Sequence, residues 1–252
     1  MFQKFGAQMY TVRSFMQTEE GVRASFRKLK ELGYEEAQTA GCAIGHELYG
    51  RIAAEEGISI VGSSEPFDTL AENPEKAMEN HRMLGTIYIG VGGPCAGAFS
   101  SLENLNRFIE RANAFADAIY PHGFKFTYHN HSHEFVRVGD KTRFDYYLEG
   151  FKDNISFVLD TYWAQHAGVD VCALMKKMEG RIDILHLKDM AVKGNDPYIT
   201  ECGHGNLNFA DIIPLAEAIG VKYLVVEQDI CPGDPFESVR FSSEYLHKNF
   251  LK

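Results

Sequence analysis

The sequence has no long hydrophobic run, no basic run and no paired cysteine motif. No segment approaches the roughly 20 apolar residues of a membrane span, and the N-terminal segment lacks the apolar core and cleavage site of a signal peptide. The five cysteines are widely spaced and form no CxxC pair, which is typical of reduced thiols rather than of disulfides or a zinc knuckle. We therefore expect a cytoplasmic protein that does not associate with membranes.

Positive charge is also scarce. The 25 basic residues are outnumbered by 35 acidic ones, so the formal net charge is −10. Most nucleic-acid-binding proteins depend on electrostatic attraction to phosphate groups, and an acidic chain lacks it. We expect a small-molecule partner and no nucleic acid. A hydrophobic content of 45% with 24% charged residues is ordinary for a globular protein with a sizeable core.

Apolar strand-like runs alternate with amphipathic helix-like segments along the whole chain. The expected strands cover 5–10, 35–38, 58–61, 86–91, 124–130, 155–160, a segment that ends near 188, and 222–227. The expected helices cover 20–32, 46–56, 74–84, 102–120, 144–148, 169–178, 209–218 and 235–250. Eight such alternations without a linker predict an α/β protein with one (β/α)₈ TIM barrel domain over 1–252. A doubly wound open sheet is the second interpretation, but no Gly-rich phosphate turn follows the first strand.

Four of the later segments deliver a side chain that can bind a metal ion. Glu134 follows the fifth strand, Asp160 and His186 lie at the ends of the sixth and seventh, and Glu227 ends the eighth. The carboxyl ends of barrel strands are where such folds keep their active sites. Taken singly, Asp160 could be a helix N-cap and His186 a hydrogen-bonded core histidine. Together, three carboxylates and one imidazole favour a site for a divalent ion such as Mn²⁺ or Mg²⁺.

Short motifs at the strand ends resemble a known family. They are QMYTVR at 8–13, YHNH at 128–131, LDT at 159–161, HLKD at 186–189 and VEQD at 226–229. The chain resembles the sugar phosphate isomerase/epimerase family of the xylose-isomerase-like TIM barrel superfamily over essentially its whole length. That superfamily also includes ketose 3-epimerases, inosose dehydratases and endonuclease IV.

The resemblance implies one divalent metal ion as cofactor, usually Mn²⁺, with Mg²⁺, Co²⁺ or Zn²⁺ as alternatives. The implied ligands are Glu134, Asp160, His186 and Glu227. Ketose epimerases carry the first glutamate within the fifth strand, whereas this stretch reads Tyr-His-Asn-His. His131 is therefore kept as the alternative first ligand.

The resemblance further implies an isomerase or epimerase of a small sugar or sugar derivative. Such an enzyme removes a proton next to a carbonyl and forms an enediolate that the metal ion stabilises. Glu134 and Glu227 correspond to the pair of glutamates that transfer protons in the family. His131 is a further catalytic candidate because imidazole titrates near neutral pH, and Lys188 is another because it is expected to point the same way as His186.

Substrate contacts are expected from residues near the same strand ends, namely Gln8, Glu65, His129, Trp163 and His204. Trp163 could offer its ring to a sugar or pack within a loop. His204 lies in a Gly-His-Gly turn at 203–205 that resembles the family's Gly-x-Gly turn, and such glycines can let backbone N–H groups approach an anion.

Three other functions stay open at this point. Three histidines at 129, 131 and 133, near the position where a ketose epimerase has its glutamate, favour an inosose-dehydratase-like lyase on the same metal site. An endonuclease IV-like phosphodiesterase is disfavoured by the acidic charge, and a non-catalytic sugar-binding barrel would bind no metal. The sequence is compatible with a homo-oligomer.

Overall fold

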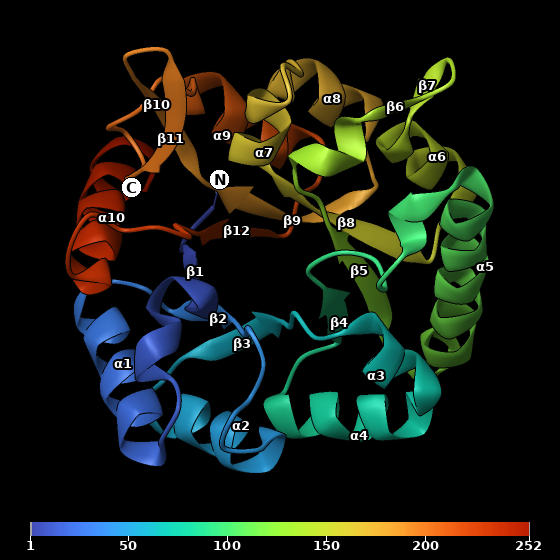
Figure 1. Cartoon of the computed structure of the whole chain (residues 1–252). Coiled ribbons are helices and arrows are strands. Elements are labelled where there is room, and N and C mark those ends of the chain that lie inside the picture. Colours follow the sequence, from blue (N-terminus) through green and yellow to red (C-terminus); the bar gives the residue numbers. More distant parts are fainter. Residues whose placement is uncertain (1, 252) are drawn as a thin grey trace.

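The computed structural model describes residues 2–251 and contains a nearly closed barrel of eight parallel strands with the helices outside it (Figure 1). The barrel strands are β1 (Gly6–Gln8), β2 (Glu36–Gln38), β3 (Ser59–Gly62), β4 (Tyr88–Val91), β5 (Lys125–His129), β8 (Ile155–Asp160), β9 (Ile182–Leu187) and β12 (Tyr223–Val226). Their hydrogen-bonded order is β3-β2-β1-β12-β9-β8-β5-β4. This confirms the predicted (β/α)₈ fold.

The barrel closes between β3 and β4 through the segment that follows β3. The backbone N–H of Glu65 donates to the carbonyl of Gly90 at 2.9 Å, and the N–H of Gly90 donates to Ser63 Oγ at 3.1 Å. A Cβ atom at position 90 would lie 2.2 Å from the Ser63 carbonyl oxygen. Only glycine therefore allows the two segments to approach this closely.

The outer layer contains ten α-helices among the described residues. They are α1 (Glu19–Glu31), α2 (His46–Glu55), α3 (Phe67–Glu72), α4 (Pro74–Leu84), α5 (Leu102–Ile119), α6 (Arg143–Gly150), α7 (Thr161–His166), α8 (Val171–Lys177), α9 (Phe209–Ala218) and α10 (Pro235–Phe250). Gly33 and Gly85 follow α1 and α4 with φ of 89° and 75°, as expected for residues that stop a helix. No helix in the described part of the chain is both long and apolar enough to cross a membrane.

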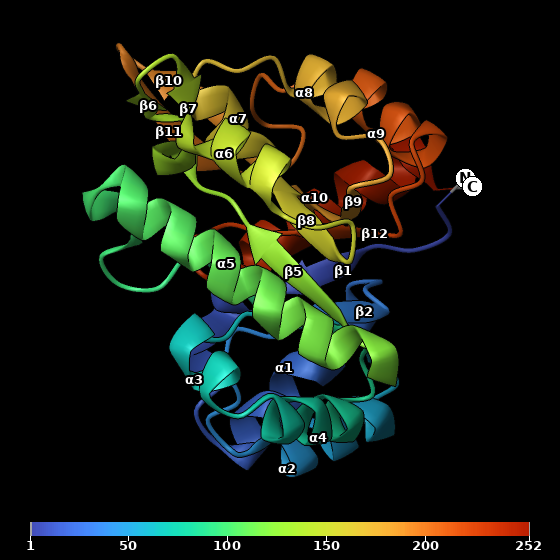
Figure 2. The same cartoon turned by 90° about the vertical axis from the view of Figure 1, so that its right-hand side faces the viewer.

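Several short elements were not predicted, and some of them lie around the carboxyl ends of the strands. They include the helices α3 and α7, the 3₁₀ helix at Met9–Phe15, the hairpin of β6 (Arg137–Val138) and β7 (Lys141–Thr142), and the hairpin of β10 (Asp189–Lys193) and β11 (Asp196–Thr200). The first strand is shorter than the expected 5–10 because the chain enters the 3₁₀ helix at residue 9. Figure 2 shows both hairpins at one end of the barrel and both termini at the opposite end.

The interior of the barrel holds a small apolar cluster beneath the candidate site. It consists of Val61, Tyr88, Val158, Ile184 and Val225, all of them buried. Successive side chains of a strand point to opposite faces, so residues two apart share a face. The residues two positions after the last three cluster members are Asp160, His186 and Glu227. The apolar cluster therefore forms the layer of the barrel interior directly below these three polar side chains.

Candidate active site

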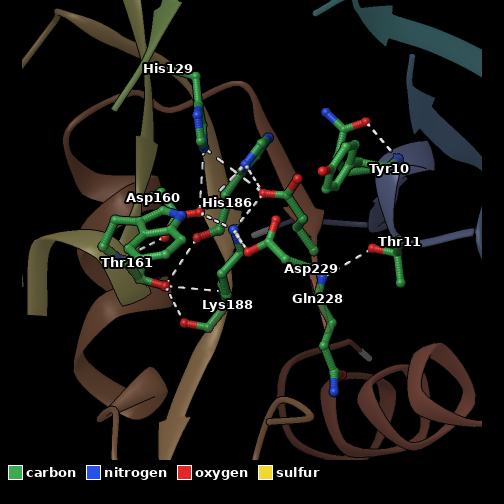
Figure 3. A network of polar contacts seen from close by, with 12 residues as sticks. Tyr10, Thr11, His129, Asp160, Thr161, His186, Lys188, Gln228 and Asp229 are labelled. Carbon is green, nitrogen blue, oxygen red and sulfur yellow. Dashed lines mark hydrogen bonds and ion pairs between the residues drawn. The ribbon is translucent and has the colours of Figure 1, made fainter. Parts of the chain in front are cut away.

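Four buried side chains converge at the carboxyl ends of adjacent strands (Figure 3). His129 ends β5, Asp160 ends β8, His186 lies in β9 and Glu227 follows β12. Each offers one nitrogen or oxygen atom, and these atoms all lie within 4.8 Å of one another. The strands β8 and β9 pair in a register that sets Asp160 beside His186. We call these four residues the ligand cluster.

The distances within the ligand cluster suit a shared cation. His129 Nε2 lies 3.4 Å from Asp160 Oδ2 and 3.9 Å from Glu227 Oε2. His186 Nδ1 lies 2.9 Å from Glu227 Oε2 and 3.7 Å from Asp160 Oδ2. Among the described residues, neither His186 Nδ1 nor Glu227 Oε2 has a hydrogen bond of favourable geometry, although both atoms are buried. A divalent ion could be coordinated by both atoms, so the residues of the ligand cluster fit a divalent ion. Two imidazoles with two carboxylates favour Mn²⁺, Co²⁺ or Zn²⁺ over Mg²⁺.

His186 is oriented from across the barrel by Gln38 in β2. The ring atom Nε2 lies 2.5 Å from Gln38 Oε1, and an amide oxygen can only accept a hydrogen bond. Nε2 therefore carries a proton and Nδ1 faces Glu227. Burial alone would lower the pKa of His186, but the carboxylates of Glu227 and Asp160 raise it to about 8.

Asp160 has two structural roles. One oxygen, Oδ1, accepts the backbone N–H of Trp163 at 2.9 Å and caps α7, as one interpretation of the sequence expected. The other oxygen, Oδ2, faces the other three residues of the ligand cluster. Although burial opposes ionisation, the ammonium group of Lys188 and the neighbouring imidazoles hold the pKa of Asp160 well below its usual range. The carboxylate is therefore available as an anion.

Lys188 is fully buried and surrounded by three carboxylates. Its Nζ lies 2.9 Å from Asp160 Oδ2, 2.8 Å from Glu227 Oε2 and 2.8 Å from Asp229 Oδ2. Burial alone would lower the pKa of Lys188, but these carboxylates raise it above the usual range. The side chain is thus a cation in the metal-free site. Sequence reasoning missed Asp229, although its position two residues after Glu227, in the motif VEQD, was a usable signal.

Glu134, the expected first ligand, is not brought to the ligand cluster. It is buried in a separate group with His131 and His133, because the chain leaves β5 at His129 and enters a 3₁₀ turn at Ser132–Phe135. Tyr128 donates its hydroxyl to Glu134 Oε1 at 2.7 Å, and the backbone N–H of His131 donates to Oε2 at 2.8 Å. These contacts make Glu134 a residue that fixes the turn, and the structure sets His129 beside Asp160, His186 and Glu227 instead.

His131, the alternative first ligand, lies against the ligand cluster without being part of it. Its ring centroid is 4.8 Å from that of His129 and 5.4 Å from that of Trp163. Burial and the neighbouring His129 lower the pKa of His131 to about 3. The imidazole is therefore neutral near pH 7 and can exchange hydrogen bonds with a bound molecule.

A cavity of about 480 Å³ opens above the ligand cluster. It is lined by Gln8, Tyr10, Arg13, Gln38, Ala40, Ser64, Gly92, His129, His131, Trp163, His186, Glu227, Asp229 and Ile230. A cavity of this size accommodates a small organic molecule. Three of the expected substrate-binding residues, Gln8, His129 and Trp163, thus lie in its wall.

The other two expected substrate-binding residues, Glu65 and His204, are not among the lining residues. Glu65 Oε1 lies 3.0 Å from His46 Nε2. The side chain of His204 is 52% exposed and lies 3.7 Å from Glu201. The structure therefore does not bring these two residues to the wall of the cavity.

The backbone of the glycine turn around His204 is hydrogen-bonded to the carboxylate of Asp189. The carboxylate of Asp189 accepts the backbone N–H groups of Gly203 at 2.9 Å and Gly205 at 3.0 Å. A Cβ atom at position 205 would lie 2.3 Å from Asp189 Oδ1. These N–H groups are occupied by Asp189, so the expectation that they approach a substrate anion does not hold.

Comparisons with known proteins agree with the barrel fold. Residues 26–246 match the model of the xylose isomerase-like TIM barrel family. A sugar phosphate isomerase/epimerase from Parabacteroides distasonis superposes with a TM-score of 0.82 at 23% identity, covering 98% of this chain and 94% of that one. No curated protein matches the sequence significantly.

Two further solved structures are similar over most of their length. A probable 3-DHS dehydratase involved in petrobactin synthesis, from Bacillus anthracis, has a TM-score of 0.74 at 13% identity and covers 98% of this chain and 100% of that one. A D-allulose 3-epimerase from Methylomonas sp. has a TM-score of 0.73 at 13% identity, with 98% and 97% covered. Identities this low show a shared fold.

Proposed function

The chain belongs to the xylose isomerase-like TIM barrel family, and from this premise we propose that it is a divalent-metal-dependent isomerase or epimerase of a small sugar or sugar derivative. The family membership confirms the resemblance predicted from the strand-end motifs. The observation that carries the proposal is the ligand cluster at the bottom of a cavity of about 480 Å³. Buried charged groups that converge in a cavity are typical of catalytic sites.

We assign the metal ion to His129, Asp160, His186 and Glu227, with Mn²⁺ as the first choice and Co²⁺, Zn²⁺ and Mg²⁺ as alternatives. When bound, the ion acts as a Lewis acid that polarises a substrate carbonyl and stabilises the negative charge beside it. Gln38 fixes the imidazole of His186 through Nε2. A hydrogen bond of this kind raises metal affinity by holding the ligand in its binding orientation.

Glu227 is the proposed base for the proton next to the carbonyl. Burial would raise the pKa of Glu227, but Lys188 and His186 lower it below the usual range, so the carboxylate is ionised. Its contacts with both groups use Oε2, and we therefore assign proton acceptance to Oε1. Lys188 keeps Glu227 ionised and supplies a positive charge beside it.

His131 is the proposed partner of Glu227 for the second proton transfer. It lines the cavity, and its lowered pKa leaves a neutral ring. Such a ring can deliver the proton of one ring nitrogen to the substrate only while its other nitrogen accepts a proton from water. Glu134 supports this role from outside the cavity, because its carboxylate holds the backbone N–H of His131. Delivery of a proton from His131 to the opposite face of the carbon epimerises the substrate, and return of the proton from Glu227 to the neighbouring carbon isomerises it.

A lyase reaction on the same site is the second candidate. The observation that favours it is the pair of imidazoles His129 and His131, which both line the cavity with ring centroids 4.8 Å apart. An imidazole beside the substrate can protonate a hydroxyl group as it departs from the carbon next to the carbanion. The two candidates share the first proton abstraction and differ in the second step.

Metal analysis combined with solvent deuterium uptake tests the proposal. We expect the protein to catalyse exchange at a carbon next to the carbonyl of at least one sugar in a panel of ketoses, aldoses and inososes that includes their phosphorylated and acidic derivatives. Chelation should abolish the exchange and Mn²⁺ should restore it. Absence of metal-dependent exchange across the panel would contradict the proposal, and loss of water from a substrate would identify the lyase reaction.

The variant Glu227→Gln tests the assignment of the base. Turnover should fall by roughly 10²–10⁴-fold, the usual contribution of a general base, while circular dichroism stays unchanged. Glu110→Gln removes the same charge from an exposed position on α5 and should leave turnover unaffected. Normal turnover in Glu227→Gln would exclude this residue as the base.

A further inference from the structure

Arg13 places a positive charge at the mouth of the cavity. Its side chain is exposed and belongs to the residues that line the cavity. The guanidinium carbon lies 4.1 Å from the centroid of the Tyr10 ring, a favourable cation–π distance. The guanidinium group of Arg13 therefore packs against the ring of Tyr10, which also lines the cavity.

Two backbone carbonyls hold the guanidinium group in place. Nη1 donates to the carbonyl of Tyr10 at 2.8 Å, and Nη1 and Nη2 both donate to the carbonyl of Asp229 at 3.2 Å. The two carbonyls come from the 3₁₀ helix after β1 and from the segment after β12. Asp229 turns its carboxylate inward to Lys188, which leaves its carbonyl oxygen for Arg13. The orientation of the guanidinium group is thus fixed before any ligand binds.

The charge of Arg13 is not neutralised by a carboxylate. Within residues 2–251 the structure shows no ion pair for Arg13, whereas Arg111 pairs with Asp68 at 2.7 Å and Arg240 pairs with Glu244 at 2.6 Å. Carbonyl oxygens satisfy N–H groups without cancelling a full charge. The other cation of the site, Lys188, is already shared by three carboxylates.

One edge of the guanidinium group is open. The carbonyl contacts use Nη1 and one hydrogen of Nη2, so Nε–H and the second hydrogen of Nη2 point along the free edge. Two parallel N–H groups on one edge match the two oxygens of a carboxylate or phosphate group. The free edge therefore has the geometry of an oxyanion receptor.

We propose that Arg13 binds an anionic substituent of the substrate, so that the enzyme prefers an acidic or phosphorylated sugar over a neutral one. This inference rests on the proposed function and names the substrate class of the same site. The ligand cluster lies at the bottom of the cavity and Arg13 at its mouth, so the anionic group lies at the end of the substrate away from the reacting carbon. When a neutral sugar is bound, the N–H groups on the free edge of Arg13 can only donate to water.

Direct binding measurements test this inference without requiring turnover. Calorimetric titrations compare three probes that share one ring, namely D-glucose 6-phosphate, D-glucuronate and D-glucose, on the metal-loaded protein. The phosphate and the carboxylate arms identify which oxyanion is preferred. The variants are Arg13→Gln, Arg13→Lys and a matched control, Arg137→Gln. Arg137 is exposed, and its guanidinium group donates to the carbonyl of Asp140.

We expect at least one anionic probe to bind the wild type at least about tenfold more tightly than D-glucose. Arg13→Gln should abolish this preference and Arg13→Lys should retain part of it, because an ammonium group keeps the charge but lacks the fork. Arg137→Gln should behave as the wild type does. An anion preference that survives in Arg13→Gln, or a wild type that binds no anionic probe more tightly than D-glucose, would overturn the inference. Neither result would affect metal-dependent proton exchange, so failure of this inference is distinguishable from failure of the proposed function.

Discussion

The imidazole of His129 lies 3.4 Å from the carboxylate of Asp160, measured from Nε2 to Oδ2. His129 thereby occupies the position in the ligand cluster at which the sequence predicted the carboxylate of Glu134. We expect His129→Ala to lower Mn²⁺ affinity by more than about 100-fold, because loss of a direct ligand costs more than the 10–100-fold typical of its supporting residues. Competition titration with a fluorescent chelator measures the affinity.

Glu134→Gln is the matched comparison for His129→Ala. Its carboxylate binds Tyr128 and the backbone of His131, so the variant should keep Mn²⁺ affinity within about tenfold of the wild type while lowering turnover through displacement of His131. The reverse outcome, with metal binding lost in Glu134→Gln and retained in His129→Ala, would restore Glu134 as the first ligand.

Lys188→Met should destabilise the metal-free protein. The substitution leaves the buried Asp160 and Glu227 and the partly buried Asp229 close together without their shared cation, and breaking a buried ion pair in this way costs about 3–5 kcal/mol. Urea unfolding in the presence of a chelator measures the loss. Added Mn²⁺ should recover part of it, since the ion supplies positive charge to the same carboxylates. Lys193→Met, at an exposed position in β10, is the control. Equal stability of Lys188→Met and this control would contradict the electrostatic account.

Gly205→Ala should disrupt the turn that Asp189 organises. The added methyl group would lie 2.3 Å from Asp189 Oδ1 and 2.5 Å from the carbonyl oxygen of Met190, so the carboxylate or the backbone must move. We expect a loss of about 1–3 kcal/mol in the free energy of unfolding, as for other overpacked sites. Gly233→Ala serves as the control because a Cβ atom there meets nothing within 4 Å. If both variants were equally stable, the turn would not depend on its contact with Asp189.

Stability should fall as the pH decreases below about 6.5, the usual pKa of an unfolded histidine, and His81 should contribute to this fall. Burial lowers the pKa of His81, and the hydrogen bond to the Ala77 carbonyl opposes this only in part. Over this pH range the imidazole of His81 binds a proton in the unfolded chain but not in the folded chain. The free energy of unfolding therefore decreases as the pH falls from about 6.5 to the lowered pKa of His81.

The variant His81→Gln isolates this contribution. Urea midpoints at about pH 7.5 and about pH 5.5, on either side of the histidine pKa, should differ less in His81→Gln than in the wild type. The ring of His81 lies 2.7 Å from Ser63 Oγ and 2.7 Å from the Ala77 carbonyl, so some loss of stability at both pH values is expected as well. His122→Gln, at an exposed position, should keep the pH dependence of the wild type. An unchanged pH dependence in His81→Gln would exclude His81 as the titrating group.

The barrel and three of the four cluster residues could be predicted because their signals are local. Asp160, His186 and Glu227 each end or closely follow an apolar run, and residues two positions earlier fill the barrel interior. The sequence predicts His129 only as a substrate contact, because it does not show that β5 ends at this residue. Glu134 lies five residues later, in a 3₁₀ turn whose direction depends on the buried hydroxyl of Tyr128.

Other features of the site depend on contacts between distant parts of the chain. Gln38 orients His186 across 148 positions of sequence, and Arg13 reaches the carbonyl of Asp229 across 216 positions. No periodicity in a single sequence reports such pairs. The hairpin of β10 and β11 is a different case, because its exposed alternating strands flank a Gly-Asn turn at 194–195 and could have been recognised as a turn signal.

Anomalous diffraction from crystals of the Mn²⁺-loaded protein tests the central claim most directly. Data collected at the manganese absorption edge show the position of the ion independently of any assay for turnover. We predict one anomalous peak within coordination distance of His129 Nε2, Asp160 Oδ2, His186 Nδ1 and Glu227 Oε2. A peak at His131, His133 and Glu134 instead, or no peak at the ligand cluster in protein that contains stoichiometric manganese, would contradict the account.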